Sequence, residues 1–166
     1  MSDSRITMFN HIIGNPPEGL DDKALFWAQV KLQAKLVLEE AQEMYDAAQN
    51  QDLVEVIDGQ ADVWYLNEYM QDLLEGAGVD VIEAHDSVCW NNDQKYTLNR
   101  ELAFESALKH DWDGVKSYFE EVNCLGEVYY VVKRDSDNKV LKLKGHQAPN
   151  IRKSIPDDTF EKLNGF

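Results

Sequence analysis

The chain has 166 residues, 43% of them hydrophobic and 10% aromatic, and a formal net charge of −15 at pH 7. This length and apolar content predict one domain with a sizeable core and exclude a disordered acidic chain. The negative charge argues against direct binding to nucleic acid. It leaves two roles open, namely mimicry of nucleic acid and the binding of metal cations.

Neither a membrane anchor nor a disulfide framework is expected. No apolar run approaches the roughly 18–20 residues that span a bilayer, and the N-terminus lacks the basic and apolar regions of a signal peptide. Cys89 and Cys124 have no CxxC spacing. We therefore expect a cytoplasmic protein with reduced thiols and no membrane partner.

The hydrophobic periodicity predicts four helices before residue 96. The first is the short apolar segment ITMFNHIIG, which ends at Gly14. Two long helices follow. The first runs from about residue 23 to 48, and Asp21 or Asp22 is its expected cap; the second runs from about residue 52 to 75, and Asp52 is its expected cap. Only QNQ separates them, so they should pack as an antiparallel hairpin. The fourth helix covers about residues 79 to 95.

The apolar residues of the two long helices predict their buried faces. On the first, a stripe that includes Leu38 and Tyr45 has the i, i+3, i+4, i+7 spacing of one face. The second is apolar over a wider arc and is expected to be central. Trp64, Tyr65 and Tyr69 are interpreted first as core residues and otherwise as interface residues.

From Tyr96 onward the pattern changes. Residues 99–122 predict two shorter helices broken near Asp111, and residues 127–145 predict a β-hairpin with strands EVYYVV and KVLKLK and the turn SDN. The tail HQAPNIRKSIPDD is expected to be a loop. The predicted fold class is mainly α, an antiparallel helical bundle with a C-terminal β-hairpin appendage. Residues 1–95 form its helical core, and residues 96–166 complete the same domain.

The negative charge is concentrated between Lys35 and Lys95, where fifteen Asp and Glu occur and no Lys or Arg. This number equals the whole net charge, so the rest of the chain is balanced. On the first long helix, Glu39, Glu40 and Glu43 form the pattern E-E-x-x-E. Residues three and four positions apart share a helix face, so Glu40 and Glu43 should lie together.

The second long helix carries the pattern E-x-x-D at Glu55 and Asp58, and Asp62 follows one turn later. If the hairpin turns the two faces together, four or five carboxylates converge, and like charges about 4 Å apart repel by roughly 4 kcal/mol at an effective dielectric constant near 20. Oxygen ligands without histidine favour Mg²⁺ or Mn²⁺. A solvated helix face is the alternative, whereas a ferritin-like di-iron site needs Glu-x-x-His pairs that the chain lacks.

Cations return after this stretch. Asn92 and Lys95 stand three residues apart at the end of the fourth helix, and Lys139 and Lys142 lie in a segment where basic residues outnumber acidic ones. Metal-binding carboxylates with detached cations suit a polyphosphate substrate, because metal ions bridge phosphates and activate water while Lys and Arg bind the remaining oxygens. For the basic segment, an ordinary solvated strand face is the alternative.

The segments LVLEEAQEM and EVIDGQADVWYL, followed by Asn-x-x-Lys, resemble signature helices of the MazG-like all-α nucleoside triphosphate pyrophosphohydrolases. That superfamily includes phosphoribosyl-ATP pyrophosphohydrolases and dimeric dUTPases. MFNHIIGNPP is similar to the opening of many bacterial and viral members, and DNKVLKLKG resembles their closing segment. The resemblance covers residues 8–95 and 137–157 and implies a MazG-like helical bundle.

By position, the resemblance implies a site for Mg²⁺, with Mn²⁺ as a substitute and two or more ions per site. It implies metal ligands at Glu40, Glu43, Glu55 and Asp58, activation of water by Glu39 or Glu40, and a further or supporting carboxylate at Asp62. It also implies sugar or phosphate contacts for Asn92 and Lys95 and phosphate contacts for Lys139 and Lys142. Phe9, His11 and Asn15 are candidates for contacts with the base, and an ordinary position on the helix surface is the alternative for His11.

The implied reaction hydrolyses a nucleoside triphosphate, (d)NTP, between the α- and β-phosphates, giving the monophosphate and diphosphate. Guanine is favoured as the base, with dCTP, dUTP and phosphoribosyl-ATP as alternatives. Relatives are homodimers or homotetramers with sites between subunits. Two departures concern the substrate contacts: residues 96–136 precede the closing segment, and NNDQK replaces the family's Ser-Asn-Met-Ser-Lys.

An acidic DNA-mimic inhibitor is the alternative from another class of protein. It would explain the net charge equally well. It does not explain why the acids follow the E-x-x-E and E-x-x-D spacing while the C-terminal segment is basic. The sequence therefore favours the enzyme.

Overall fold

The computed structural model describes residues 4–17 and 21–165, and the chain divides into two compact units. Met1–Val81 with Arg152–Phe166 is named the helical unit, and Ile82–Ile151 the sheet unit. The fold is mainly α with a small sheet towards the C-terminus, which confirms the predicted fold class. Within the described part of the chain, no helix combines the length and apolar character needed to cross a membrane. The predicted division at residue 95 stays a prediction.

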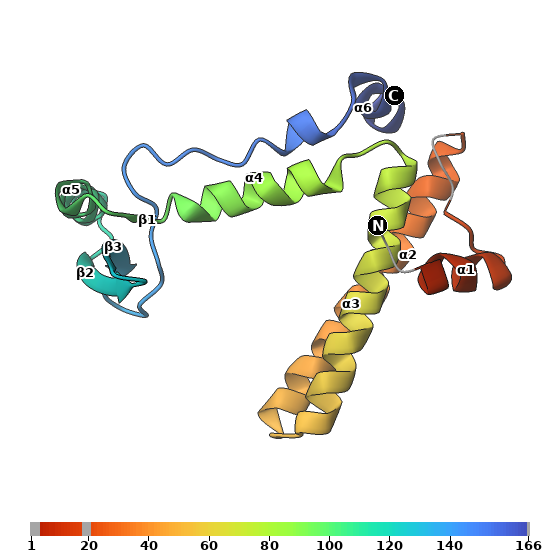
Figure 1. The fold of residues 1–166 in the computed structure, drawn as a ribbon, viewed down its shortest axis with the longest axis horizontal. Helices are drawn as coiled ribbons and strands as arrows, with labels where there is room; N and C mark the ends of the chain where they lie inside the picture. The colour runs from red at the N-terminus through yellow and green to blue at the C-terminus, as the bar shows by residue number, and fades with distance from the viewer. Residues whose placement is uncertain (1–3, 18–20, 166) are drawn as a thin grey trace. The chain divides into compact units, whose positions relative to one another are not determined.

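Three helices form the N-terminal part of the helical unit, namely α1 (Ser4–Ile12), α2 (Lys23–Gln49) and α3 (Leu53–Gly76). Asp22 caps α2 by accepting a hydrogen bond from the N–H of Leu25 at 2.9 Å. Asp52 caps α3 by accepting from the N–H groups of Val54 and Glu55. The two long helices lie side by side as a hairpin (Figure 1), which confirms both predicted helices and their caps.

The core of the helical unit lies at one end of this hairpin. Tyr69 and Leu73 of α3 pack with Ile6 of α1, and Phe26 of α2 packs with Leu163. Leu163 belongs to α6 (Asp157–Asn164), which follows the short helix η1 (Ile151–Ser154). The prediction that this tail is entirely loop is therefore wrong. Both helices are too short to carry the two or more apolar repeats that identify a helix in a sequence.

Away from that end, much of the apolar surface of α2 and α3 is exposed. Leu38 and Tyr45 of the predicted buried stripe are 69% and 59% exposed. Trp64 is 62% exposed and Tyr65 37%, so the expectation that α3 is central and that both residues are core is wrong for the single chain. Tyr69 is buried, as predicted. Two helices alone bury only the faces that they turn towards each other.

The sheet unit contains all but the first residue of α4 (Val81–Asp93), followed by β1 (Tyr96–Thr97), α5 (Arg100–Trp112), β2 (Ser117–Cys124) and β3 (Glu127–Arg134). The strands form an antiparallel sheet in the order β1-β3-β2. Ala103 and Ala107 of α5 pack with Val132 of β3, and Leu143 completes the same cluster. This cluster is the core of the sheet unit.

Two predictions for the sheet unit are wrong. Residues 117–124 form β2 and not a helix, because every residue of the segment pairs with β3 and this pairing overrides local helical propensity. The hairpin turn therefore lies at Leu125 and Gly126 and not at SDN. KVLKLK forms no regular strand and contributes one isolated bridge, between Val140 and Lys133.

The turn of this hairpin yields a prediction for stability. Leu125 and Gly126 have positive φ angles of 53° and 87°, a combination typical of the type I′ turn, which favours asparagine at its first position. Leu125 is 100% exposed and makes no packing contribution. Leu125→Asn should therefore raise the free energy of unfolding by about 0.5–1 kcal/mol, as measured by urea denaturation. Val128→Asn, within β3, is the control and should not stabilise; no gain for Leu125→Asn would contradict the prediction.

Candidate functional site

The two acidic patterns line one hollow of the helical unit, beside the turn that joins α2 to α3. Its volume is about 320 Å³. The lining consists of Glu40, Glu43, Asp46, Ala47, Asn50, Asp52, Glu55, Asp58 and Gly59. This feature is named the acidic hollow. The structure thus brings together the four residues that were predicted as metal ligands.

Like charges act on one another around the acidic hollow. The pKa of Glu40 is raised above its ordinary value, first by burial and then by the carboxylates of Glu43, Asp62, Asp58 and Glu39. Because Asp58 and Asp62 belong to α3, the charges of both helices meet at Glu40. Asp62 is therefore within electrostatic reach of Glu40, although it does not line the hollow.

Glu39 and Glu40, the two candidates for activating water, have different surroundings. The Glu39 carboxylate forms an ion pair with the ammonium of Lys35 at 2.9 Å on the exposed side of α2. Glu40 is half-buried and lines the acidic hollow. This geometry favours Glu40 for proton transfer, and the role itself stays a prediction.

Gly59 determines how closely the two helices approach at the acidic hollow. A Cβ atom added to Gly59 would lie 2.9 Å from Cβ of Met44 and 3.2 Å from its Cα. Any side chain at this position would therefore push α2 and α3 apart beside Asp58. Gly59 was not among the predicted site residues. A glycine inside a helix, where it costs about 1 kcal/mol relative to alanine, was the sequence signal for this close approach.

The donor atoms of the acidic hollow suit a hard divalent cation. Carboxylates predominate, and no histidine or cysteine is among the described residues that line it. As the side chains stand, no three His, Cys, Asp or Glu within residues 4–17 and 21–165 are placed to hold a metal ion. Binding would therefore require the carboxylates to turn inward, which the rotatable bonds of glutamate allow.

Phe9, His11 and Asn15 are not among the residues that line the acidic hollow. The ring of Phe9 meets that of Tyr65 edge to face, with 6.4 Å between centroids. The Asn15 side-chain oxygen accepts a hydrogen bond from Gln29 at 3.1 Å, and its backbone carbonyl accepts one from the hydroxyl of Tyr69 at 2.6 Å. Asn15 thus holds the segment after α1 onto α2 and α3, while His11 is exposed.

The remaining predicted contacts lie in the sheet unit. The ammonium of Lys95 donates to Oδ1 of Asn92 at 2.6 Å, so the structure brings this pair together. Lys139 and Lys142 are exposed in the segment that follows β3. Contacts of these four residues with a substrate stay predictions.

Residues 6–87, just under half of the chain, match the family model of phosphoribosyl-ATP pyrophosphohydrolase. The matched segment contains both acidic helices and ends before Asn92. Neither a curated protein nor a solved structure matched the chain. The family evidence therefore concerns the helices that form the acidic hollow.

Proposed function

We propose that this chain, a member of the MazG-like superfamily of nucleotide pyrophosphohydrolases through residues 6–87, is a metal-dependent enzyme that converts (d)NTPs into monophosphate and diphosphate. The observation that carries the proposal is the acidic hollow, where carboxylates of two consecutive helices meet. Their mutual repulsion has no evident structural benefit. A divalent cation would relieve it.

Glu40, Glu43, Glu55 and Asp58 would hold Mg²⁺, or Mn²⁺ in its place, with two or more ions at each site. Such ions neutralise charge on the phosphates and lower the pKa of water. Glu40 is proposed to receive the proton of the attacking water, because it lines the acidic hollow while Glu39 is paired with Lys35.

The departing diphosphate also needs positive charge. Lys95, oriented by its hydrogen bond to Asn92, is proposed to bind the β- and γ-phosphates together with Lys139 and Lys142. The support is the position of these residues in the motifs of the superfamily. Charge-assisted hydrogen bonds of this kind are about twice as strong as neutral ones.

A second copy of the chain is proposed to cover part of the exposed hairpin, in a homodimer or homotetramer. Leu38 and Tyr45 share one face of α2, and Val54 and Ile57 share one face of α3, yet all four are more than half exposed. Apolar side chains gathered on a surface in this way mark an interface. Size-exclusion chromatography with light scattering tests this part of the proposal, and a monomer would contradict it.

The proposed activity predicts that hydrolysis depends on a metal ion. The full chain is incubated with each (d)NTP and with phosphoribosyl-ATP, which is included because the matched family model bears its name. Anion-exchange chromatography should detect monophosphate and diphosphate with Mg²⁺ or Mn²⁺ and neither product in EDTA. Full activity in EDTA would contradict the metal dependence.

The position of cleavage is tested in ¹⁸O-labelled water. Attack at the α-phosphorus should place the label in the nucleoside monophosphate. Label in orthophosphate, with a nucleoside diphosphate as the other product, would indicate a different reaction. No reaction with any nucleotide, combined with tight binding to a basic DNA-binding protein, would favour the acidic DNA mimic.

A further inference from the structure

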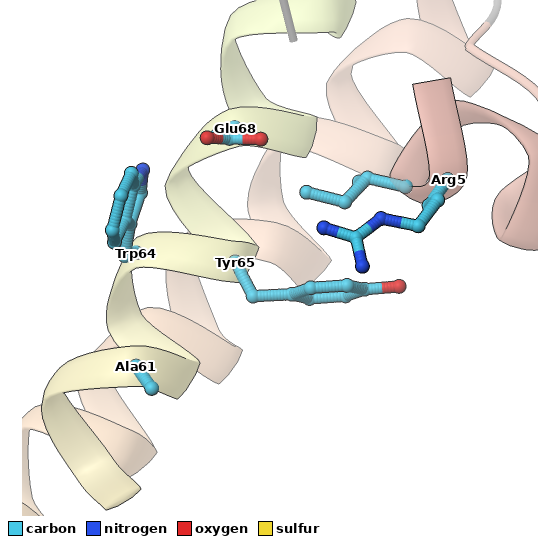
Figure 2. Close-up of a pocket in the computed structure, with 6 residues that line it drawn as sticks. Arg5, Ala61, Trp64, Tyr65 and Glu68 are labelled. Atoms are coloured by element: carbon cyan, nitrogen blue, oxygen red, sulfur yellow. The ribbon is translucent and has the colours of Figure 1, made fainter. Parts of the chain in front are cut away.

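Two hollows away from the acidic hollow differ in their lining. One lies between α1 and α3 of the helical unit (Figure 2), and its charged residues, Arg5 and Glu68, already have interaction partners within the chain. The other, of about 290 Å³, lies on the sheet of the sheet unit. No charged side chain is among the described residues that line it, which are Tyr96, Val122, Cys124, Tyr129 and Val131.

The hollow on the sheet lies on the face that is turned away from α5. Side chains alternate between the two faces of a strand, and residues paired across strands share a face. Val132 and its partner Phe119 pack in the cluster that α5 completes. Val131, one position earlier, pairs with Tyr96 and Glu120 on the opposite face. The hollow and the charged residues around it, Glu120, Glu127 and Lys133, are named the open sheet face.

Strand β3 is apolar on both of its faces. Residues 128–132 read VYYVV, whereas a strand with one solvated face alternates between apolar and polar residues. Tyr96 and Val122 of the open sheet face are 43% and 38% exposed. Among the described residues, no hydrophobic core cluster includes a side chain of this face. The sequence of β3 therefore indicates a further surface that covers it.

The polar groups of the open sheet face already have partners, so the face can be buried at low cost. The hydroxyl of Tyr96 donates to the carboxylate of Asp93 at 2.8 Å, and the ring of Tyr96 meets that of Tyr129 edge to face, with 5.5 Å between centroids. The ammonium of Lys133 forms an ion pair with Glu120. Burial of a polar group destabilises chiefly when that group has no partner.

The charges along β3 make the open sheet face complementary to itself. On this face the strand presents Glu127, Tyr129, Val131 and Lys133, with a negative residue at one end and a positive residue at the other. A two-fold axis that lies between two facing copies, perpendicular to their strands, reverses the direction of β3. Glu127 of each copy then lies over Lys133 of the other, and Tyr129 lies over Val131.

Glu127 is available for this contact. It is exposed, and it forms no ion pair with any residue of the ranges 4–17 and 21–165. The ammonium of Lys133 has three donors, so it can bind this carboxylate and keep Glu120. The net charge of −15 opposes the approach of two copies through an acidic surface. Opposite charges that meet across the open sheet face remove this obstacle locally.

We infer that the open sheet face binds the same face of a second copy of this chain, in an antiparallel, two-fold contact. The three strands offer at most roughly 400 Å² per copy, half of the roughly 800 Å² of a standard interface. The contact is therefore reversible and depends on the protein concentration. It does not depend on the proposed hydrolysis, and it uses other residues than the exposed faces of α2 and α3.

Sedimentation velocity of the full chain in EDTA tests the contact at protein concentrations from about 1 to 300 μM, where interfaces of this size form. The mass of the original chain should rise with concentration. Val122→Glu should abolish the rise, because the new carboxylate lies near Glu120 of the other copy. Val128→Glu is the matched control. Val128 is also 38% exposed but belongs to the other face of β3, so this variant should associate as the original chain does.

Glu127→Lys and Lys133→Glu test the two-fold arrangement. Either substitution alone places like charges opposite each other and should weaken the association about tenfold. In an equimolar mixture the association should recover, because each lysine of one variant then faces a glutamate of the other. Circular dichroism establishes that each variant is folded.

Three outcomes would overturn the inference. The first is a mass that does not change with concentration. The second is an equal effect of Val122→Glu and Val128→Glu, which would place the contact elsewhere on the chain. The third is folded charge variants whose mixture associates no better than either variant alone. If Lys133→Glu fails to fold without its ion pair to Glu120, the comparison of Val122→Glu with Val128→Glu decides.

Discussion

Glu43→Ala and Asp58→Ala should each lower kcat by about three orders of magnitude. Each substitution removes one carboxylate of the acidic hollow, one from α2 and one from α3. Stabilisation of transition-state charge by a bound metal is worth several kcal/mol, and a loss of about 4 kcal/mol corresponds to a thousandfold lower rate. Rates are measured at saturating Mg²⁺ and triphosphate. Glu75→Ala, on α3 but outside the lining, should retain its kcat.

The same two variants should remain folded and keep or gain stability without metal. The pKa of Glu40 is raised in the folded chain by burial and by neighbouring carboxylates, which include Glu43 and Asp58. The folded state therefore binds this proton more tightly than the unfolded state does, and stability falls as the pH rises through the raised pKa. Removing Glu43 or Asp58 weakens the repulsion, so this dependence on pH should become shallower.

Urea denaturation in EDTA at about pH 5 and pH 8 measures this effect. Adding Mg²⁺ should stabilise the original chain more than either variant, because only the original chain has the complete set of carboxylates. If both variants unfold, and Glu75→Ala unfolds as readily, the acidic residues have a structural role and not a catalytic one.

The long helices and the acidic hollow were predictable because local signals determine them. Asp22 and Asp52 begin α2 and α3 through hydrogen bonds within four residues of each cap. The spacing of three between Glu40 and Glu43 fixes them on one face of α2. A short break forces the next helix to return antiparallel, which brings Glu55 and Asp58 beside them.

Features that depend on distant neighbours could not be predicted in the same way. The strand conformation of residues 117–124 follows from pairing with β3 and from no local pattern. Trp64 and Tyr65 were interpreted as core residues, and this was wrong for the single chain. An apolar stripe on a helix shows only that this face of the helix will be covered. It does not distinguish a covering segment of the same chain from a second copy of the chain or from a ligand.

Gly59 is the clearest example of a residue whose importance could not be predicted from the sequence, because that importance depends on where α2 and α3 come closest. Gly59→Ala should lower kcat/KM by about a hundredfold, the loss that a displacement near 1 Å can cause in a catalytic site. The added Cβ would lie 2.9 Å from Cβ of Met44 and 3.2 Å from its backbone Cα, so no flexible side-chain end can yield and the helices must separate. Overpacking of this kind costs about 1–3 kcal/mol of stability.

Two companion variants distinguish displacement of the carboxylates from simple loss of stability. Gly76→Ala is the matched control on α3, since a Cβ there would meet nothing within 4 Å, and it should keep full activity. Met44→Gly in the Gly59→Ala background removes the closest contact and should recover part of kcat/KM, although a glycine inside α2 lowers stability further. Recovery of activity at lower stability can arise only if the separation of α2 and α3 controls the reaction. Full activity in Gly59→Ala alone would show that the acidic hollow tolerates wider spacing than its geometry indicates.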